Sequence, residues 1–201
     1  MKKYIAFLIL STLIQCQSQK INTMIPVVDK KFEKFDVEDF NKNSSRGLYV
    51  IKKENFVIIR NNQNPGFLEE LYLENSFYVL NKFYYSNGGV RAKGYYFNEG
   101  SPMGIWYHYD ESGKLIKEED TDIGYDFGPM EVLRYCKKNG ISLPKGYQEY
   151  GFHTRVLKLE REGKKVWKIF YPIKSDLMKE IVLDGKTGKE LEIKFKPIKN
   201  S

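Results

Sequence analysis

The sequence predicts a protein of the α+β class that is mostly antiparallel β, with a sheet of β-hairpins followed by a helix and a β-meander. Short runs of β-branched and aromatic residues alternate with turns rich in Gly, Asn and Asp over residues 46–125. One segment, 128–140, has the start and stop signals of a helix. Strand-like runs then continue as far as residue 195. A helix followed by antiparallel strands is typical of a small α+β unit.

The composition supports a folded chain and limits its chemistry. The 201 residues are 41% hydrophobic and 15% aromatic, which is enough for the cores of one or two compact domains and excludes a disordered chain. The net charge is +7. The paired lysines are dispersed along the chain, so nucleic-acid binding is not expected. A metal cage of His and Cys would need nearly all of the 2 His and 2 Cys.

Residues 1–15 are predicted to be a signal peptide. A basic start, Met1-Lys2-Lys3, precedes the apolar run 4–14, as in secretory signals. A helix of that length reaches roughly 16 Å, about half of a hydrocarbon core, so the run does not span a bilayer. Removal of the segment takes Lys2 and Lys3 from the 33 Lys and Arg, which leaves +5 against the 26 Asp and Glu. Attraction to an anionic membrane surface is the expected use of this charge.

The end of the apolar run, Leu13-Ile14-Gln15-Cys16, resembles a bacterial lipobox. The resemblance implies that Cys16 is acylated on its thiol with chains such as palmitate, becomes the mature N-terminus and anchors the protein to a membrane. No acidic run follows Cys16, which favours the outer membrane of a bacterial cell envelope, with the protein on the periplasmic face. Two alternatives stay open: an uncleaved N-terminal anchor, and an ordinary signal peptide in which Cys16 is an incidental thiol.

Residues 16–45 are predicted to be a polar, lipid-anchored tether. Within this segment, Asp36 is predicted to cap a short helical turn that has Asp39 near its start. Cys136 is the other cysteine of the chain, so no intramolecular disulfide is expected once Cys16 carries lipid.

The predicted sheet domain, 46–125, consists of short strands joined by tight turns. Strands are expected at 48–51, 56–59, 71–73, 77–85, 90–97 and 104–109. An internal repeat appears when the chain is aligned with itself at an offset of 24 residues. The alignment matches Tyr85 with Tyr109, Gly89 with Gly113, and Lys93 with Lys117.

Two segments, 84–94 and Gly104-Ile-Trp-Tyr-His-Tyr-Asp-Glu-Ser-Gly-Lys-Leu-Ile-Lys117, resemble units of the MORN-repeat variant family, which includes YwqK-type antitoxins. The resemblance covers about a quarter of the chain. It implies a twisted antiparallel sheet that serves as a binding scaffold without chemistry of its own. Flanking hairpins are expected to cap the two units, because an array of two repeats is short.

The last predicted unit, 126–198, begins with the helix at 128–140. Pro129 is expected at the first helical position, Glu131 lies early, Lys137 and Lys138 lie late, and Gly140 is the stop signal. Strands are expected at 153–160, 166–171, 180–183 and 191–195.

The aromatic strand 165–171 and the hairpin 180–191, with its Asp184-Gly-Lys-Thr-Gly188 turn, resemble the PepSY-like fold. The resemblance implies a periplasmic or extracellular module that binds proteins or their peptides and in some relatives restrains proteases. From the residues alone, the turn also fits a generic hairpin.

No residue is predicted to be catalytic, and no metal or cofactor is expected. His108 and His153 are not in a ligand spacing, and His108 should lie on the sheet face opposite Tyr107 and Tyr109. Cys136 falls on the helix face that should be buried. The consecutive carboxylates of 118–122 lack the spacing of a calcium loop and suggest a solvated strand end.

Four aromatic residues are predicted to bind a partner: Tyr85, Tyr96, Trp106 and Tyr109. Adjacent aromatic pairs in a strand point to opposite faces, so some of these rings should stand on a solvent face. The alternative is that the aromatic residues pack as cross-strand pairs in the core.

These observations favour a non-enzymatic, membrane-anchored envelope lipoprotein that binds an unknown envelope or secreted protein. An immunity or inhibitor protein for a toxin or protease is one form of this function. A structural or glycan-binding envelope lipoprotein is the alternative, and a hydrolase built on scattered carboxylates is a third class.

Overall fold

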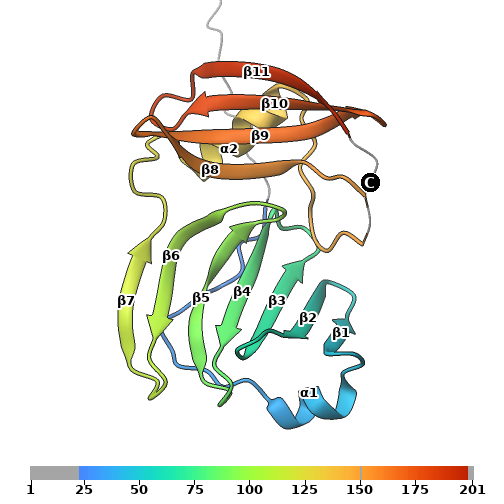
Figure 1. Ribbon diagram of the computed structural model, residues 1–201, viewed down its shortest axis with the longest axis vertical. Helices are drawn as coiled ribbons and strands as arrows, with labels where there is room; N and C mark the ends of the chain where they lie inside the picture. Colours follow the sequence, from blue (N-terminus) through green and yellow to red (C-terminus); the bar gives the residue numbers. More distant parts are fainter. Residues whose placement is uncertain (1–22, 150, 199–201) are drawn as a thin grey trace, which may run out of the picture.

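The computed structural model describes residues 23–149 and 151–198 and is mostly antiparallel β, with a seven-stranded and a four-stranded sheet (Figure 1). The predicted signal peptide and Cys16 lie outside the described residues. Neither helix of the described ranges is long and apolar enough to cross a membrane. The elements in chain order are α1 (Val37–Asn43), β1 (Leu48–Lys52), β2 (Phe56–Asn62), β3 (Phe67–Leu73), β4 (Tyr78–Tyr84), β5 (Val90–Phe97), β6 (Pro102–Tyr109), β7 (Leu115–Asp120), α2 (Pro129–Lys138), β8 (Arg155–Arg161), β9 (Lys164–Lys174), β10 (Leu177–Asp184) and β11 (Glu190–Pro197).

The seven-stranded sheet is a simple meander in which each strand from β1 to β7 pairs antiparallel with the next. The strands predicted between residues 48 and 109 are confirmed, with bounds that differ by a few residues. β7 adds a seventh strand, which begins inside the second MORN-like segment, 104–117. Short connections impose this topology, because a turn of a few residues can join only neighbouring antiparallel strands.

The structural repeat of this sheet has an offset of 25 residues, so the predicted offset of 24 is wrong by one. Gly88 (φ 81°) and Gly113 (φ 89°) occupy the same position in two equivalent turns, and each donates its N–H to a carbonyl oxygen three residues earlier at 3.0 Å. Tyr84 and Tyr109 therefore correspond, and both are buried. The sequence alignment used the second glycine, Gly89, which does not adopt positive φ.

The four-stranded sheet, in the order β11-β10-β9-β8, packs one face against α2 (Figure 1). The predicted helix ends are confirmed: Pro129 lies at the start, Glu131 in the first turn, and Lys137 and Lys138 in the last. The buried side of α2 consists of Val132, Leu133 and Cys136, so the predicted burial of Cys136 is also confirmed.

One hydrophobic core joins the two sheets across the predicted boundary at residues 125 and 126. Trp167 of β9 is 0% exposed and contacts Phe97 of β5, with the ring centroids 5.9 Å apart. The turn after β5 covers the free edge of β8, where the Ser101 N–H donates to the Val156 carbonyl at 3.0 Å. Two residues further along the same edge, the side chain of Lys158 binds Asp122, in the turn after β7.

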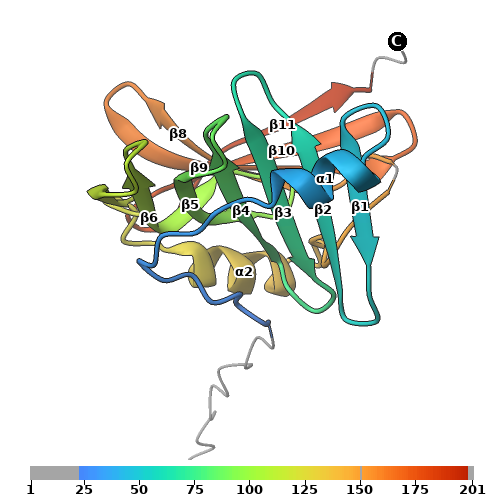
Figure 2. The same cartoon turned by 90° about the horizontal axis from the view of Figure 1, so that it is seen from below.

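Residues 23–36, called the strap, lie across one face of the seven-stranded sheet (Figure 2). The Phe35 N–H donates to the Gly88 carbonyl at 2.8 Å, and the Phe35 ring stacks on Phe67 with centroids 4.5 Å apart. The expectation of a tether over 16–45 is therefore wrong for residues 23–45. The predicted cap at Asp36 is confirmed, since its carboxylate accepts the Asp39 N–H at 2.9 Å at the start of α1.

Lys93 of β5 fixes the strap through its buried ammonium group. The Lys93 side chain is 0% exposed, and Nζ donates to the carboxylates of Glu33 at 2.5 Å and Asp29 at 3.3 Å. It also donates to the backbone carbonyl of Lys31 at 2.6 Å. A buried ammonium destabilises the folded state unless it is paired and hydrogen-bonded, so the strap satisfies a requirement that the sheet itself creates.

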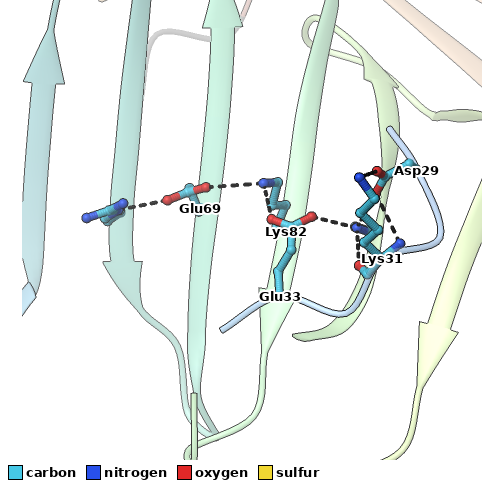
Figure 3. A network of polar contacts seen from close by, with 7 residues as sticks. Asp29, Lys31, Glu33, Glu69 and Lys82 are labelled. Atoms are coloured by element: carbon cyan, nitrogen blue, oxygen red, sulfur yellow. Dashed lines mark hydrogen bonds and ion pairs between the residues drawn. The ribbon is translucent and has the colours of Figure 1, made fainter. Parts of the chain in front are cut away.

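The same charged row continues across the sheet, as Figure 3 shows for Glu33, Lys82 and Glu69. Glu33 also pairs with Lys82, and Glu69 lies between Lys82, at 3.8 Å, and Arg60, at 2.8 Å. Positive and negative groups thus alternate from β2 to the strap, and each is less than one third exposed. A network of this kind stabilises more than isolated surface pairs do.

We expect Lys93→Ala to lower the free energy of unfolding by about 2 to 4 kcal/mol, because it leaves the carboxylates of Asp29 and Glu33 without their buried partner. Urea denaturation followed by circular dichroism measures the change. Lys117→Ala is the control: its side chain is 57% exposed, and it should cost less than about 1 kcal/mol. Equal losses in the two variants would show that the strap does not depend on Lys93.

Candidate binding face

The two faces of the seven-stranded sheet differ in what covers them. The strap and α1 lie on the strap face, which carries Lys82, Lys93 and Tyr109. The opposite face, called the open face, is not crossed by any described strand or helix (Figures 1 and 2). The loop after α2 borders the open face at one end, where Tyr147 contacts Tyr72 with ring centroids 5.4 Å apart. A partner therefore has access to the open face and not to the strap face.

The centre of the open face is formed by six residues, called the open-face cluster. Strand pairing places them on β3 to β6: Glu70, Asn81, Phe83, Gly94, Tyr96 and Trp106. Their side chains share one face because alternate residues of a strand point to the same side of the sheet.

Trp106 is the fixed part of this cluster. Its ring covers Gly94, where a Cβ atom would lie 2.4 Å from indole atoms, so glycine is required at that position. The indole N–H donates to the Tyr95 carbonyl at 3.2 Å. Tyr96 and Phe83 flank the indole with centroid distances of 5.2 and 6.2 Å. Trp106 is 5% exposed, whereas Tyr96 and Phe83 are half-buried and provide the accessible aromatic surface.

Glu70 and Asn81 are the polar members of the cluster, and one of their oxygen atoms lacks a hydrogen-bond partner among the described residues. Glu70 and Asn81 lie directly opposite each other on β3 and β4. Burial raises the pKa of the Glu70 carboxyl, against the opposing effect of hydrogen bonds from Tyr72, at 3.2 Å, and from Asn81. Asn81 is 7% exposed, and its buried Oδ1 accepts no hydrogen bond from the described residues. An unsatisfied acceptor among aromatic rings is typical of a binding surface.

The four predicted binding residues do not form one site. Tyr96 and Trp106 belong to the open-face cluster. Tyr85 lies in a turn and donates its hydroxyl to the Tyr109 carbonyl at 2.8 Å. Tyr109 is 1% exposed and packs in the core of the strap face, so it is not available to a partner. Its burial follows from the strap, whose Phe32 covers its ring at a centroid distance of 6.2 Å.

The other candidate residues have structural surroundings. His108 lies on the open face, opposite Tyr107 and Tyr109 as predicted, and its Nε2 is 2.9 Å from Glu119 Oε2. Burial raises the pKa of the Cys136 thiol to about 12, which disfavours a thiolate. Within 23–149 and 151–198, no group of three or more His, Cys, Asp or Glu side chains is arranged to hold a metal ion.

Sequence reasoning missed Phe83, Asn81 and Glu70 as members of this face. A signal was present, because Phe83 and Asn81 alternate with the strap-face residues Lys82 and Tyr84 along β4. The alternation does not indicate which of the two faces is covered.

Comparisons of the chain with protein-family models, with curated proteins and with solved structures find no match.

We expect Glu70→Gln to stabilise the protein at pH 7. Because the pKa of Glu70 is raised in the folded state, ionisation of this carboxyl opposes folding. The protonated carboxyl favours the folded state, and this stabilisation is lost as the pH rises through the folded pKa. The difference between variant and wild type should therefore vanish below about pH 4 and grow toward neutral pH, by about 1.4 kcal/mol for each tenfold change in the ionisation constant. Urea denaturation at several pH values measures it.

Glu119→Gln is the matched control on the same face. Lys117 lowers the pKa of the Glu119 carboxyl, so this variant should lose stability toward neutral pH, the opposite sign. A Glu70→Gln curve that falls with pH in the same way as the control would contradict the inferred burial of Glu70.

Proposed function

We propose that this protein is a non-enzymatic binding protein of the bacterial cell envelope that contacts another protein through the open face of its seven-stranded sheet. The observation that carries the proposal is the contrast between the faces. The strap face has its charged row paired by the strap, and the Tyr109 hydroxyl on that face is buried in the core without a hydrogen-bond partner among the described residues. The open face carries accessible Tyr96 and Phe83 beside Asn81 Oδ1, which also lacks a partner among those residues. Aromatic residues around a desolvated centre are typical of interface hot spots.

The chemistry of the open-face cluster indicates what the partner supplies. Glu70 and Asn81 Oδ1 are acceptors, and the guanidinium of Arg91 lies 5.8 Å from the Phe83 ring centroid at the border of the cluster. The partner should therefore present N–H or O–H donors, such as an amide, Lys or Arg side chain, within an apolar surround. A protein surface provides both together.

The anchor is part of the proposal. If Cys16 carries lipid, the strap begins seven residues later, and seven extended residues span at most about 25 Å. The sheet would then lie close to the membrane, held by a strap that is bound to the sheet through Lys93. Several acyl chains are needed for stable anchoring, since each buried methylene contributes about 0.8 kcal/mol.

The resemblances to the MORN-repeat variant family and to the PepSY-like fold are part of the same proposal. The 25-residue repeat of positive-φ glycines at Gly88 and Gly113 supports a MORN-like sheet over 46–125. The helix α2 followed by a four-stranded meander supports a PepSY-like module over 126–198. Both families bind other molecules without catalysis, and an immunity or inhibitor role toward a toxin or protease fits that pattern.

Site-specific photo-crosslinking in living cells tests the proposed binding face. A photoreactive phenylalanine at Tyr96 should give a defined protein adduct, whereas the same residue at Phe32, on the strap face, should give none. Once the partner in the adduct is identified, Tyr96→Ala should raise the dissociation constant of the complex at least about tenfold, as for a hot-spot aromatic residue. Tyr85→Ala, in the turn, should leave it within about twofold.

Adducts that form at Phe32 and not at Tyr96 would contradict the assignment of the open face. Cosedimentation with isolated cell wall that is lost in Tyr96→Ala, with no protein adduct, would instead establish the glycan-binding alternative.

Metabolic labelling tests the anchor. We expect labelled palmitate to be incorporated into the wild-type protein and not into Cys16→Ser, because the thiol is the acylation site. The variant should also leave the membrane fraction, which a blot of fractionated cells measures. Equal labelling of wild type and variant would overturn the lipobox assignment.

A further inference from the structure

β11 is a free edge strand at the outer border of the four-stranded sheet (Figure 1). It pairs only with β10, and its other edge makes no backbone hydrogen bond with the described residues. The opposite edge of this sheet, β8, is covered by the turn at Gly100 and Ser101. An uncovered edge strand of eight residues is a template for pairing with another strand.

The residues of β11 are complementary to a second copy of the same strand. If two copies pair antiparallel around Ile193, Glu192 of each copy lies directly opposite Lys194 of the other, and Ile193 lies opposite itself. The neighbouring register, centred on Lys194, places two ammonium groups opposite each other, and a centre at Phe195 places Lys194 opposite Lys196. Only the register centred on Ile193 pairs opposite charges at the centre.

The apolar residues of β11 favour the same register. Ile193 is 45% exposed and Phe195 60% exposed, although Ile193 lies opposite Ile181, a member of the core beside α2. In the paired strands the two Ile193 side chains cover each other. The β-bulge between Val182 and Leu183 takes Leu191 out of register, so regular pairing around Ile193 extends over Glu192, Ile193 and Lys194.

The free edges of the other sheet lack this pattern. β1 has five residues and a single charge, at its end. β7 ends in the consecutive acidic residues Glu118, Glu119 and Asp120, which repel a like strand.

We propose that β11 is a self-association surface, through which two copies of this chain form a dimer with a continuous eight-stranded antiparallel sheet, centred on Ile193. A two-fold axis perpendicular to the sheet places both α2 helices on the same side. The surface is remote from the open-face cluster, so dimerisation leaves both open faces free. The proposal does not depend on the identity of the partner that the open face binds.

Charge reversal tests this register in the full chain, with two differently tagged copies produced in one cell and recovered through one tag in detergent. The wild-type copies should copurify. Copies that both carry E192K, or both carry K194E, place like charges opposite each other, and their recovery should fall at least tenfold. An E192K copy together with a K194E copy restores both Glu–Lys pairs and should recover near the wild-type level.

The mixed pair also controls for folding, because a variant that failed to fold would not be rescued by its complement. Equal recovery in all combinations, or no recovery of the wild-type pair, would overturn the proposal.

Cysteine crosslinking tests the geometry independently. Residues directly opposite in an antiparallel pair have Cα atoms about 4.5 to 5.5 Å apart, within the range of a disulfide. Ile193→Cys in the full chain should give a covalent dimer on mild oxidation of membranes. Ile173→Cys, of the same residue type at 40% exposure in β9, is the matched control and should give no covalent dimer, as should the wild type with Cys16 and Cys136. Crosslinking of Ile173→Cys to the same extent as Ile193→Cys would show chance collision and contradict the paired strands.

Discussion

The buried ammonium group of Lys93 is the constraint on which the arrangement of this protein depends. β5 places the group inside the folded protein, where the sheet alone does not neutralise it. The carboxylates come from Asp29 and Glu33 of the strap, more than 50 residues earlier in the chain. Because the side chain of Lys93 is fully buried, the strap must cover this face whenever the protein is folded. The covered face, the burial of Tyr109 and the packing of Phe35 follow from that requirement.

Because the strap covers the strap face, the open face is the one that a partner can reach. The strap face satisfies its charges within the chain, through alternating groups from Arg60 to Glu33. The open face also carries polar groups, but among the described residues no cation pairs with the partly desolvated Glu70 and no donor reaches the buried Asn81 Oδ1. A sequence selected only for stability would replace such groups with apolar ones, because each opposes folding. Their presence beside accessible aromatic rings is the physical reason for assigning binding to this face.

Local sequence patterns predicted the elements well and their long-range arrangement poorly. The ends of α2, from Pro129 to Gly140, and the cap of α1 at Asp36 depend on interactions within a few residues, which the sequence displays directly. The strap was missed because Lys93 in a strand has the same appearance whether it is solvated or buried, and its partners are distant in sequence. Tyr109 was misjudged for the same reason: alternation separates two faces but does not show which one another segment will cover. The offset of the repeat was wrong by one because Gly88 and Gly89 are adjacent, and only backbone conformation distinguishes them.

The net charge has a different meaning once the lysines are placed. Lys82 and Lys93 on the strap face and Lys158 at the joint between the sheets are largely buried and paired with carboxylates. Their charges hold the fold together and do not form a basic surface, so a positive total is weak evidence for attraction to an anionic membrane. Membrane association then rests on the lipid proposed at Cys16. If Cys16 carries lipid, the strap that Lys93 binds is the described segment nearest to the anchor, so the buried ion pairs of Lys93 join that segment to the centre of the sheet.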